Sequence, residues 1–491
     1  MLTSYLSLSD PKKTIAIIGA GPSGVATLKA FQDSPEVESG EWEVTAFEAR
    51  EKLGGVWLAS SPIADDPPLT PTYDSLITNV PHPCMGFSTQ PYPPSTHIFP
   101  KAEVIQRYLE SFVDNNDLRR RIVFNERIQH VERDQKKEIW KVTLSTGEVR
   151  DFDLVVVANG HYREPRWPVI PGLDEWKASG KVEHSIKYRR PDPEHKRIVV
   201  IGASASGVDT SRDYANAGTY VFNSSNGRSP MPEDSGNNVE VRDLVKEFHP
   251  DGRVEFVDGT SEDNIDFVVV ATGYQLVLPF FSSDVVKTDF PSSYDPLPST
   301  NYNTTYSLFP LARFIWPVAQ SSFPPHTLAF MGLPRGIVVF PFLETQALAV
   351  YKAFKDPDVL DIAKEKELIV KRVHAVEERL GSKASELDIA HDWQNFFAEQ
   401  FIYRDEMYAF AGLQRRVPWW EKDIVFEGRN ELKKSWVHLL NTGKADEFVK
   451  GVGTRKGKET EDWVALLQKL IEMAKTLEVE EDVLAEEPVI L

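Results

Sequence analysis

The stretch that decides the fold is TIAIIGAGPSGVATLKAF, residues 14–31, followed by WEVTAFE at residues 42–48. The apolar run before the glycines predicts a strand buried on both faces, the residues after them predict a helix, and WEVTAF predicts a second strand. Three glycines at the spacing GxGxxG join the first strand to the helix, and the second strand ends at an acid, Glu48. This order of elements is that of a βαβ unit that binds a dinucleotide.

Each glycine of this turn has its own expected task. The first allows the tight turn, the second lets backbone N–H groups approach a pyrophosphate, and the third lets the helix lie close to the strand. The phosphates would then lie at the positive end of the helix, and the acid could accept hydrogen bonds from the two ribose hydroxyls. A glycine-rich turn that only reverses the chain is the alternative. The residues expected at this first dinucleotide are Gly19, Gly21, Pro22, Ser23, Gly24 and Glu48.

The same pattern occurs a second time. RIVVI (197–201) predicts a strand, GASASG (202–207) repeats the spacing with serine in the middle, and residues 208–217 predict the helix. The next predicted strand, 219–222, has no acid at its end and is followed by NSSNGR (223–228). Because an acid would repel a 2′-phosphate, whereas hydroxyls and an arginine can hold one, this ending favours NADPH over NADH. The residues expected here are Gly202, Ser204, Ala205, Ser206, Gly207, Ser224, Ser225 and Arg228, although Arg228 could be a surface charge instead.

Two further strands match each other in the same way. FDLVVVANG (152–160) and NIDFVVVATGY (264–274) each carry a buried apolar run that ends in a glycine turn. Two glycine fingerprints and two such strands form an internal repeat, which is more specific than either half. The sequence therefore predicts an α/β fold with two Rossmann-like dinucleotide-binding domains.

The other segments carry weaker patterns. Residues 60–100 are rich in proline and aromatic side chains and are expected to form a long ordered loop that lines a site. An amphipathic helix is expected over 102–118, an irregular stretch over 276–317 and a helix over 342–354. The remainder, from residue 357, is expected to be mostly helical, with packing aromatics at Trp393, Phe396, Phe397, Trp419, Trp420, Trp436 and Trp463.

Composition excludes several classes of function. The chain of 491 residues has a net charge of −19, which argues against nucleic acid and anionic membranes as partners. Cys84 is the one cysteine, so no internal disulfide can form and a reducing compartment is expected. No apolar run approaches the ~20 residues of a membrane span, and the N-terminus lacks the pattern of a secretory signal. We therefore expect a soluble, cytoplasmic protein without a membrane anchor, and we find no metal-spaced His/Cys cluster.

These motifs resemble those of the flavin-containing monooxygenases, a class B flavoprotein family, over about residues 15–354. The family's linker signature, FxGxxxHxxx(Y/F), is present at 178–188 with Gly180, His184 and Tyr188 in place and Ala178 instead of the leading Phe. The other matching motifs are GAGPSG (19–24), Glu48, GGVW (54–57), LITN (76–79), GASASG (202–207), ATGY (271–274) and PFLETQA (341–347).

The resemblance implies a fold and a reaction. FAD would bind in the first domain and NADPH in a second domain inserted into it, with boundaries at 1–175, 176–290 and 291–491, the last part ending in a helical segment that could supply a homodimer surface. NADPH reduces FAD, the flavin takes up O₂ as a C4a-hydroperoxide, and the distal oxygen passes to sulfur or nitrogen of a small molecule, as in N,N-dimethylaniline monooxygenase. A soluble member of fungal or bacterial type is implied.

The resemblance also implies roles for individual residues. Asn79 corresponds to the family's asparagine beside the flavin and nicotinamide, although without the family context it would be a turn residue before Val80. His184 is expected to be structural, and Gln346 is either a flavin neighbour at a helix start or an exposed helix residue. The cofactor contacts implied in this way are Gly55, Val56, Trp57, Thr78, Asn79, Thr272, Gly273, Tyr274 and Gln346.

Two other functions stay open. Baeyer–Villiger monooxygenases look similar but have Trp where this chain has Tyr188, which disfavours them. The second alternative is a flavoprotein that binds both cofactors and releases H₂O₂. Only the amounts of product and of peroxide formed per NADPH distinguish it from a monooxygenase. Disulfide reductases need a CxxC-type pair, which a chain with Cys84 alone lacks.

Overall fold

The computed structural model describes residues 12–61, 70–226, 238–381 and 383–486. The chain forms two compact units. The first unit comprises Met1–Gly54, Ile77–Asn159 and Leu278–Leu491, and the second comprises Gly55–Leu76 and Gly160–Val277. The second unit therefore interrupts the first twice along the chain.

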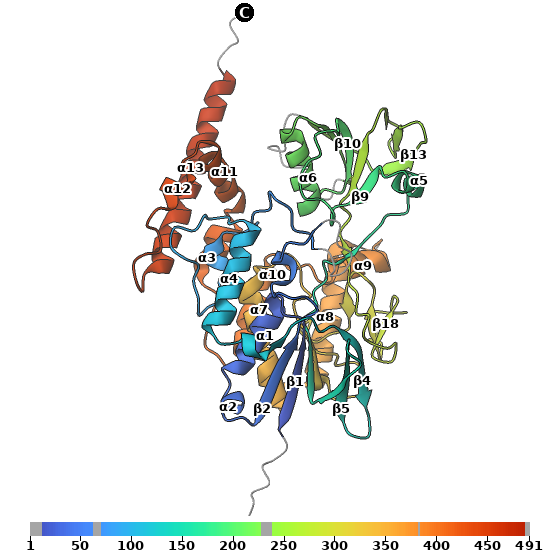
Figure 1. The fold of residues 1–491 in the computed structure, drawn as a ribbon, viewed down its shortest axis with the longest axis vertical. Helices are drawn as coiled ribbons and strands as arrows, with labels where there is room; N and C mark the ends of the chain where they lie inside the picture. The colour runs from blue at the N-terminus through green and yellow to red at the C-terminus, as the bar shows by residue number, and fades with distance from the viewer. Residues whose placement is uncertain (1–11, 62–69, 227–237, 382, 487–491) are drawn as a thin grey trace, which may run out of the picture. The chain divides into compact units, whose positions relative to one another are not determined.

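The first unit is built on a five-stranded parallel sheet of order β21-β7-β1-β2-β3. Figure 1 shows β1 and β2 of this sheet side by side. Its strands are β1 (Lys13–Ile18), β2 (Trp42–Phe47), β3 (Ile122–Val123), β7 (Leu154–Val157) and β21 (Leu328–Phe330). β7 is fully buried, as is β1 from Ile15 onward, which explains why both are nearly continuous apolar runs. Helices α1 (Pro22–Gln32) and α7 (Val339–Lys355) pack together, with Phe31 edge-on to Tyr351 at 5.9 Å.

Two small sheets complete the strands of the first unit. One is antiparallel, with β4 (Ile128–Asp134), β5 (Ile139–Leu144) and β6 (Val149–Phe152). The other contains β18 (Val286–Thr288), β19 (Asn301–Asn303) and β20 (Leu308–Phe309). The prediction of an irregular stretch over 276–317 is wrong at this sheet, because strands of two or three residues are too short to show an alternating pattern.

The helices of the first unit follow the sequence prediction closely. α4 covers Ala102–Asn115, and the C-terminal part contains α8 (Ile362–Leu380), α9 (Glu386–Asp392), α10 (Glu399–Phe410), the π-helix η6 (Glu421–Phe426), α11 (Arg429–Asn441), α12 (Ala445–Val449) and α13 (Glu459–Glu486). Short pieces elsewhere in the chain are α2 (Pro35–Glu38), α3 (His82–Met85), η1 (Gly55–Trp57), η2 (Arg119–Arg121), η4 (Pro325–Thr327) and η5 (Pro357–Val359). Two predicted packing aromatics are wrong: Phe397 and Trp419 are each 60% exposed. Each follows or precedes another aromatic, and adjacent residues point in different directions.

The second unit repeats the architecture of the first. Its parallel sheet has the order β12-β11-β10-β16-β9, so β10 lies between β11 and β16 as β1 lies between β2 and β7. The strands are β9 (Val182–His184), β10 (Arg197–Ile201), β11 (Tyr220–Ser224), β12 (Val239–Arg242) and β16 (Phe267–Val270), with helices α5 (Leu173–Ala178) and α6 (Ala205–Asn216). Smaller strands are β8 (Glu164–Pro165), β13 (Val245–Phe248), β14 (Val254–Phe256), β15 (Ser261–Glu262) and β17 (Tyr274–Gln275). The predicted α/β class with two Rossmann-like sheets is confirmed.

No helix within the described residues combines the length and apolarity that crossing a membrane requires.

Candidate functional site

The first glycine turn joins β1 to α1 and leaves no room for side chains. Gly19 has φ 106°, and a Cβ on it would lie 2.6 Å from the carbonyl oxygen of Ala158. A Cβ on Gly24 would lie 1.9 Å from the carbonyl oxygen of Gly19. α1 begins at Pro22 after Gly21, and no side chain caps its first amides. The turn therefore presents free N–H groups at a helix N-terminus, which is the chemistry that binds phosphate.

Glu48 lies directly beside this turn. Its side chain is almost fully buried, and its Oε2 accepts a hydrogen bond from the N–H of Ala20 at 2.9 Å. Its Oε1 accepts from the N–H of Arg50 at 3.1 Å, and the Arg50 guanidinium lies 3.5 Å away. The carboxylate is thus held at the carboxyl end of β2, where a Rossmann acid meets a ribose.

Two other glycines, which the sequence analysis did not single out as cofactor contacts, border this turn. The N–H of Gly54, the first of the two adjacent glycines, donates to the carbonyl oxygen of Ala20 at 3.1 Å. A Cβ on Gly332 would lie 2.5 Å from Oγ of Ser23. A glycine two residues after the last strand of the sheet, β21, is the available sequence signal for Gly332.

The side chain of Gln346 is hydrogen-bonded to the backbone of Gly332. Its side chain is fully buried, so the alternative of an exposed helix residue is wrong. Its Oε1 accepts from the N–H of Gly332 at 2.9 Å, and its Nε2 donates to the hydroxyl of Tyr403 at 2.9 Å. That hydroxyl donates in turn to the carbonyl oxygen of Arg313 at 2.8 Å. α7 begins before Phe342, so Gln346 lies well inside the helix; a direct cofactor contact stays a prediction.

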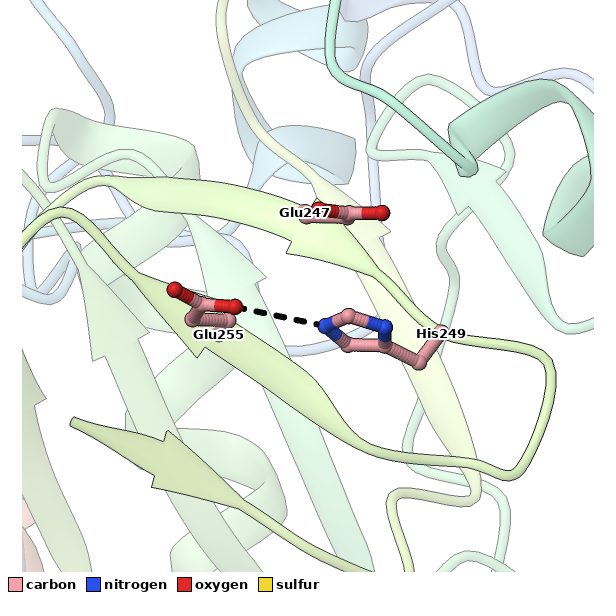
Figure 2. A group of neighbouring side chains, drawn as sticks. All are labelled: Glu247, His249 and Glu255. Carbon is pink, nitrogen blue, oxygen red and sulfur yellow. Dashed lines mark ion pairs between the residues drawn. The ribbon is translucent and has the colours of Figure 1, made fainter. Parts of the chain in front are cut away.

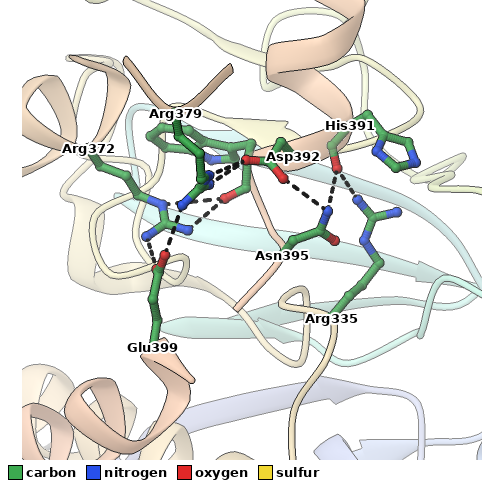
Figure 3. A network of polar contacts seen from close by, with 8 residues as sticks. Arg335, Arg372, Arg379, His391, Asp392, Asn395 and Glu399 are labelled. Carbon is green, nitrogen blue, oxygen red and sulfur yellow. Dashed lines mark hydrogen bonds and ion pairs between the residues drawn. The ribbon is translucent and has the colours of Figure 1, made fainter. Parts of the chain in front are cut away.

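A network of polar contacts holds the segment that follows Gly332 (Figure 3). The N–H of Arg335 donates to the carbonyl oxygen of Gln394 at 2.7 Å, and its guanidinium donates to that of His391. Around it, Arg372 pairs with Glu399 at 2.6 Å, and the remaining members are Arg379, Asp392 and Asn395. These contacts tie α8, α9 and α10 to the loop between β21 and α7.

Asn79 lies in a turn whose neighbours are fixed. Its own side chain is exposed, whereas Thr78 is buried. The Thr78 hydroxyl donates to the carbonyl oxygen of Val80 at 2.8 Å, and the Thr78 N–H donates to that of Pro100 at 3.0 Å. The hydroxyl of Thr78 is therefore used locally, and it shapes the turn that presents the amide of Asn79.

The second glycine turn repeats the first in detail. Gly202 has φ 114°, and a Cβ on it would lie 2.5 Å from the carbonyl oxygen of Ala271. A Cβ on Gly207 would lie 2.0 Å from the carbonyl oxygen of Gly202. α6 begins at Ala205 after Ser204, again with no side-chain cap, and both of these residues are exposed. This turn offers the same phosphate-binding amides as the first, and Ser206 lies half-buried in its first helical turn.

One backbone hydrogen bond aligns the two turns residue by residue. In the first unit, the N–H of Gly19 donates at 2.8 Å to the carbonyl oxygen of Phe47, the last residue of β2. In the second unit, the N–H of Gly202 donates at 2.8 Å to the carbonyl oxygen of Ser224, the last residue of β11. The acid that follows β2 is therefore matched by Ser225.

The structure corrects the prediction for Ser224. β11 continues to Ser224 rather than ending at Phe222, and the Ser224 side chain is fully buried. Its hydroxyl donates to the carbonyl oxygen of Asp243 at 3.0 Å and accepts from the N–H of Val245 at 3.1 Å, so it is not available to a ligand. Ser225 is half-buried, and Arg228 lies outside the described residues.

The residues after β16 are held by backbone contacts. The hydroxyl of Thr272 donates to the carbonyl oxygen of Arg166 at 2.5 Å, and the carbonyl oxygen of Gly273 accepts from the N–H of Arg166 at 3.0 Å. Tyr274 follows half-buried, and burial raises the pKa of its phenol to about 12. The phenol is therefore protonated at neutral pH.

His184 has the structural environment that was expected of it. It ends β9, is buried, and its Nε2 lies 3.1 Å from the carbonyl oxygen of Gly273. Its Nδ1 accepts from the N–H of Ile186 at 3.2 Å. Burial lowers the pKa of His184 to about 4, so the ring is neutral at physiological pH.

Gly55, Val56 and Trp57 form the turn η1 in the second unit. The carbonyl oxygen of Val56 accepts from the hydroxyl of Thr72 at 2.6 Å. The indole Nε1 of Trp57 is buried without a hydrogen-bond partner among the described residues. It is a donor that a bound group can use.

Within the described residues, one group of metal-capable side chains comes together, Glu247, His249 and Glu255 on the small sheet of the second unit (Figure 2). Glu255 pairs with Lys246 at 2.7 Å and with the His249 ring at 3.4 Å. These two ion pairs engage Glu255 and His249, and neither of them includes Glu247.

Comparisons with known proteins match most of the chain. A family model described as flavin-binding monooxygenase-like matches residues 12–233 and 235–419. Flavin-containing monooxygenase FMO GS-OX5 of Arabidopsis thaliana is 31% identical over 68% of this chain and 72% of its own, and FMO GS-OX-like 7 of the same plant is 30% identical over 79% and 84%. The solved structure of S-allyl-L-cysteine S-oxygenase from Allium sativum is 26% identical, with a TM-score of 0.70 over 95% of this chain and 99% of its own.

Proposed function

The chain belongs to the flavin-binding monooxygenases, and from this premise we propose that it transfers one oxygen atom of O₂ to a soft heteroatom of a small molecule. It is a monooxygenase that depends on FAD and NADPH. In the proposed reaction, substrate, O₂, NADPH and a proton give oxygenated substrate, NADP⁺ and water. Sulfur of a thioether is our first candidate, supported by the S-oxygenase among the similar structures.

We assign FAD to the first unit. The amides at the start of α1 would hold its pyrophosphate, and Glu48 would turn from the N–H of Ala20 toward the ribose hydroxyls. The flavin, once reduced, supplies the activation of O₂. Gln346 would fix the backbone at Gly332 beside the turn, and the exposed amide of Asn79 would hold the reacting groups by hydrogen bonds.

We assign NADPH to the second unit. The amides at the start of α6 would hold its pyrophosphate, and Ser225 would stand near the 2′-phosphate at the position that Glu48 has in the first unit. Ser204, Ala205 and Ser206 complete this turn, and Arg228 stays a candidate partner of the phosphate. A soft nucleophile needs little acid–base help, because the cofactor supplies the difficult chemistry.

The observation that carries the proposal is the pair of matched glycine turns, one followed by an acid and the other by a serine. It supports two different dinucleotides in one chain, one with free ribose hydroxyls and one with a 2′-phosphate. A monooxygenase that takes electrons from NADPH and passes them to O₂ through a flavin needs this combination of sites.

The test replaces Asn79 by Ser and follows NADPH consumed, product formed and H₂O₂ released with a thioether, a tertiary amine and a cyclic ketone. We expect FAD to stay bound and oxygenation to fall by about 100-fold, since removing one positioned hydrogen-bond donor costs about that much. Asn441→Ser, at the exposed end of α11, is the control and should change nothing. Unchanged turnover in the Asn79 variant would remove this residue from the mechanism, and turnover of the ketone alone would favour the Baeyer–Villiger reaction.

A further inference from the structure

The family match ends at residue 419, and the helices beyond it pack on the segment that carries Asn79. These helices, η6 and α11 to α13, belong to the first unit, as does the segment 77–101. Two sets of contacts join the two parts, and a third set lies within the segment 77–101.

The first contact is between two buried rings. His82 of α3 is 1% exposed and Trp463 of α13 is 4% exposed, and their rings meet edge-on, 4.4 Å apart at 85°. Gly453, with φ 78°, lets the chain lie against this indole, because a Cβ there would be 2.7 Å from its Nε1. Trp463 is therefore fixed from both sides, by His82 and by its own C-terminal segment.

The second contact is polar and lies nearer the surface. Nε2 of His97 is 2.6 Å from Oδ1 of Asp446 in α12. The N–H of Ser95 donates to the carbonyl oxygen of Val452 at 3.1 Å, and the hydroxyl of Ser95 accepts from the N–H of Gly451 at 3.0 Å. The segment around Ser95 is thus bonded along its length to the C-terminal residues.

The third set of contacts connects these anchored positions to Asn79. The N–H of Thr78 donates to the carbonyl oxygen of Pro100 at 3.0 Å, and the N–H of His82 donates to that of Ile98 at 2.8 Å. Asn79 lies between these two bonds. Both segments of this short ladder, 78–82 and 95–100, are therefore attached to the C-terminal part of the chain.

We propose that residues 420–486 position the turn that carries Asn79. Trp463 is the positioning residue, because its ring fixes the His82 ring at the end of this turn. This inference rests on the proposed role of Asn79. Loss of the ring contact would let the turn fluctuate, because the other anchors lie in the 95–100 segment and not in the 78–82 segment that carries Asn79. These anchors are the hydrogen bonds of Ser95 and the contacts of His97 with Asp446 and, edge-on at 5.2 Å, with Trp436. The amide of Asn79 would then be misplaced for part of the time, and more NADPH would be oxidised with O₂ to NADP⁺ and H₂O₂ instead of oxygenated product.

The test compares Trp463→Leu with Trp463→Phe, which keeps an aromatic ring, and with Trp419→Leu, which removes an exposed indole. Hydrogen–deuterium exchange of the peptide covering residues 76–84, measured on the full chain without NADPH, reports the ladder directly. We expect about tenfold faster exchange at the amides of Thr78 and His82 in Trp463→Leu, since removal of a buried aromatic contact weakens local structure by at least that factor. The other two variants should exchange as wild type does.

The same variants are then compared for the ratio of H₂O₂ to product at equal FAD content. A purely structural role of Trp463 would lower the melting temperature without changing the ratio of H₂O₂ to product. We expect this ratio to rise in Trp463→Leu and to stay unchanged in the other two variants. If that variant does not fold, the double variant Ser95→Ala and Asp446→Ala loosens the polar contact instead. Unchanged exchange and an unchanged ratio would overturn the inference. A wild-type enzyme that forms only H₂O₂ would refute the proposed function, and the exchange rates would still decide whether the C-terminal helices hold the turn.

Discussion

Replacing Ser225 by Glu should reverse the preference of the enzyme for NADPH over NADH. The alignment of the two turns places this residue where the first unit has Glu48, directly after the carbonyl oxygen that accepts from the first glycine. The substitution therefore rebuilds the ribose-binding acid of an FAD or NAD site in the second unit.

The size of the effect follows from the charges. A 2′-phosphate carries about two negative charges, and a carboxylate about 4 Å from a single charge interacts with about 1 kcal/mol in water and about 4 kcal/mol near a protein surface. Ser225 is half-buried, so we take about 3 kcal/mol of repulsion, equivalent to a loss of about 100-fold in affinity for NADPH. With NADH, the new carboxylate can accept from two ribose hydroxyls and gain about 1.5 kcal/mol, or about tenfold.

The assay measures the rate of anaerobic reduction of the bound flavin by stopped-flow absorbance, at a series of concentrations of each nucleotide. The apparent second-order rate constant of flavin reduction with NADPH, divided by that with NADH, should fall by about 1000-fold, the product of the two effects. Ser225→Gln, of similar size without charge, is the matched control and should lose only part of the NADPH affinity. A glutamate variant that keeps the wild-type ratio would refute the assignment of NADPH to this turn.

Two further predictions concern stability. Burial lowers the pKa of His184 to about 4, so the unfolded chain binds one more proton than the folded chain between pH 6.5 and 4. The contribution of His184 to stability is therefore complete above pH 6.5 and falls by about 1.4 kcal/mol per pH unit on acidification. Thermal unfolding of His184→Gln should show a weaker pH dependence over this range. Glu421→Gln should cost about 3–5 kcal/mol in chemical denaturation, because it leaves Arg404, 2% exposed in its side chain, without its ion-pair partner. The double variant Arg404→Met, Glu421→Leu should recover most of this loss, and no recovery would contradict the attribution of the loss to an unpaired buried charge.

The sequence was sufficient for the features that repeat. Both glycine turns, the strands around them and the acid at Glu48 follow from local spacing, because these features depend on residues close together in the chain. The missing acid after β11 was also visible, although the end of that strand was placed two residues early. A strand boundary cannot be read from Ser224 itself, whose burial depends on the distant carbonyl of Asp243.

Features that depend on distant partners could not be predicted. Nothing around Gln346 indicates that its amide is divided between Gly332 and Tyr403. Likewise, Trp463 was recognised only as a packing aromatic, and its contact with His82 joins residues nearly four hundred positions apart. Contacts of this kind are set by how the helices meet, which no single segment encodes.

Turnover under ¹⁸O₂ tests whether the enzyme transfers an oxygen atom of O₂ to a heteroatom. The purified enzyme is given NADPH and a thioether, and the product is analysed by mass spectrometry beside the NADPH consumed. We expect one ¹⁸O atom in the product for each NADPH oxidised, with little H₂O₂. Stoichiometric H₂O₂ without labelled product from the thioether or from a tertiary amine would contradict it.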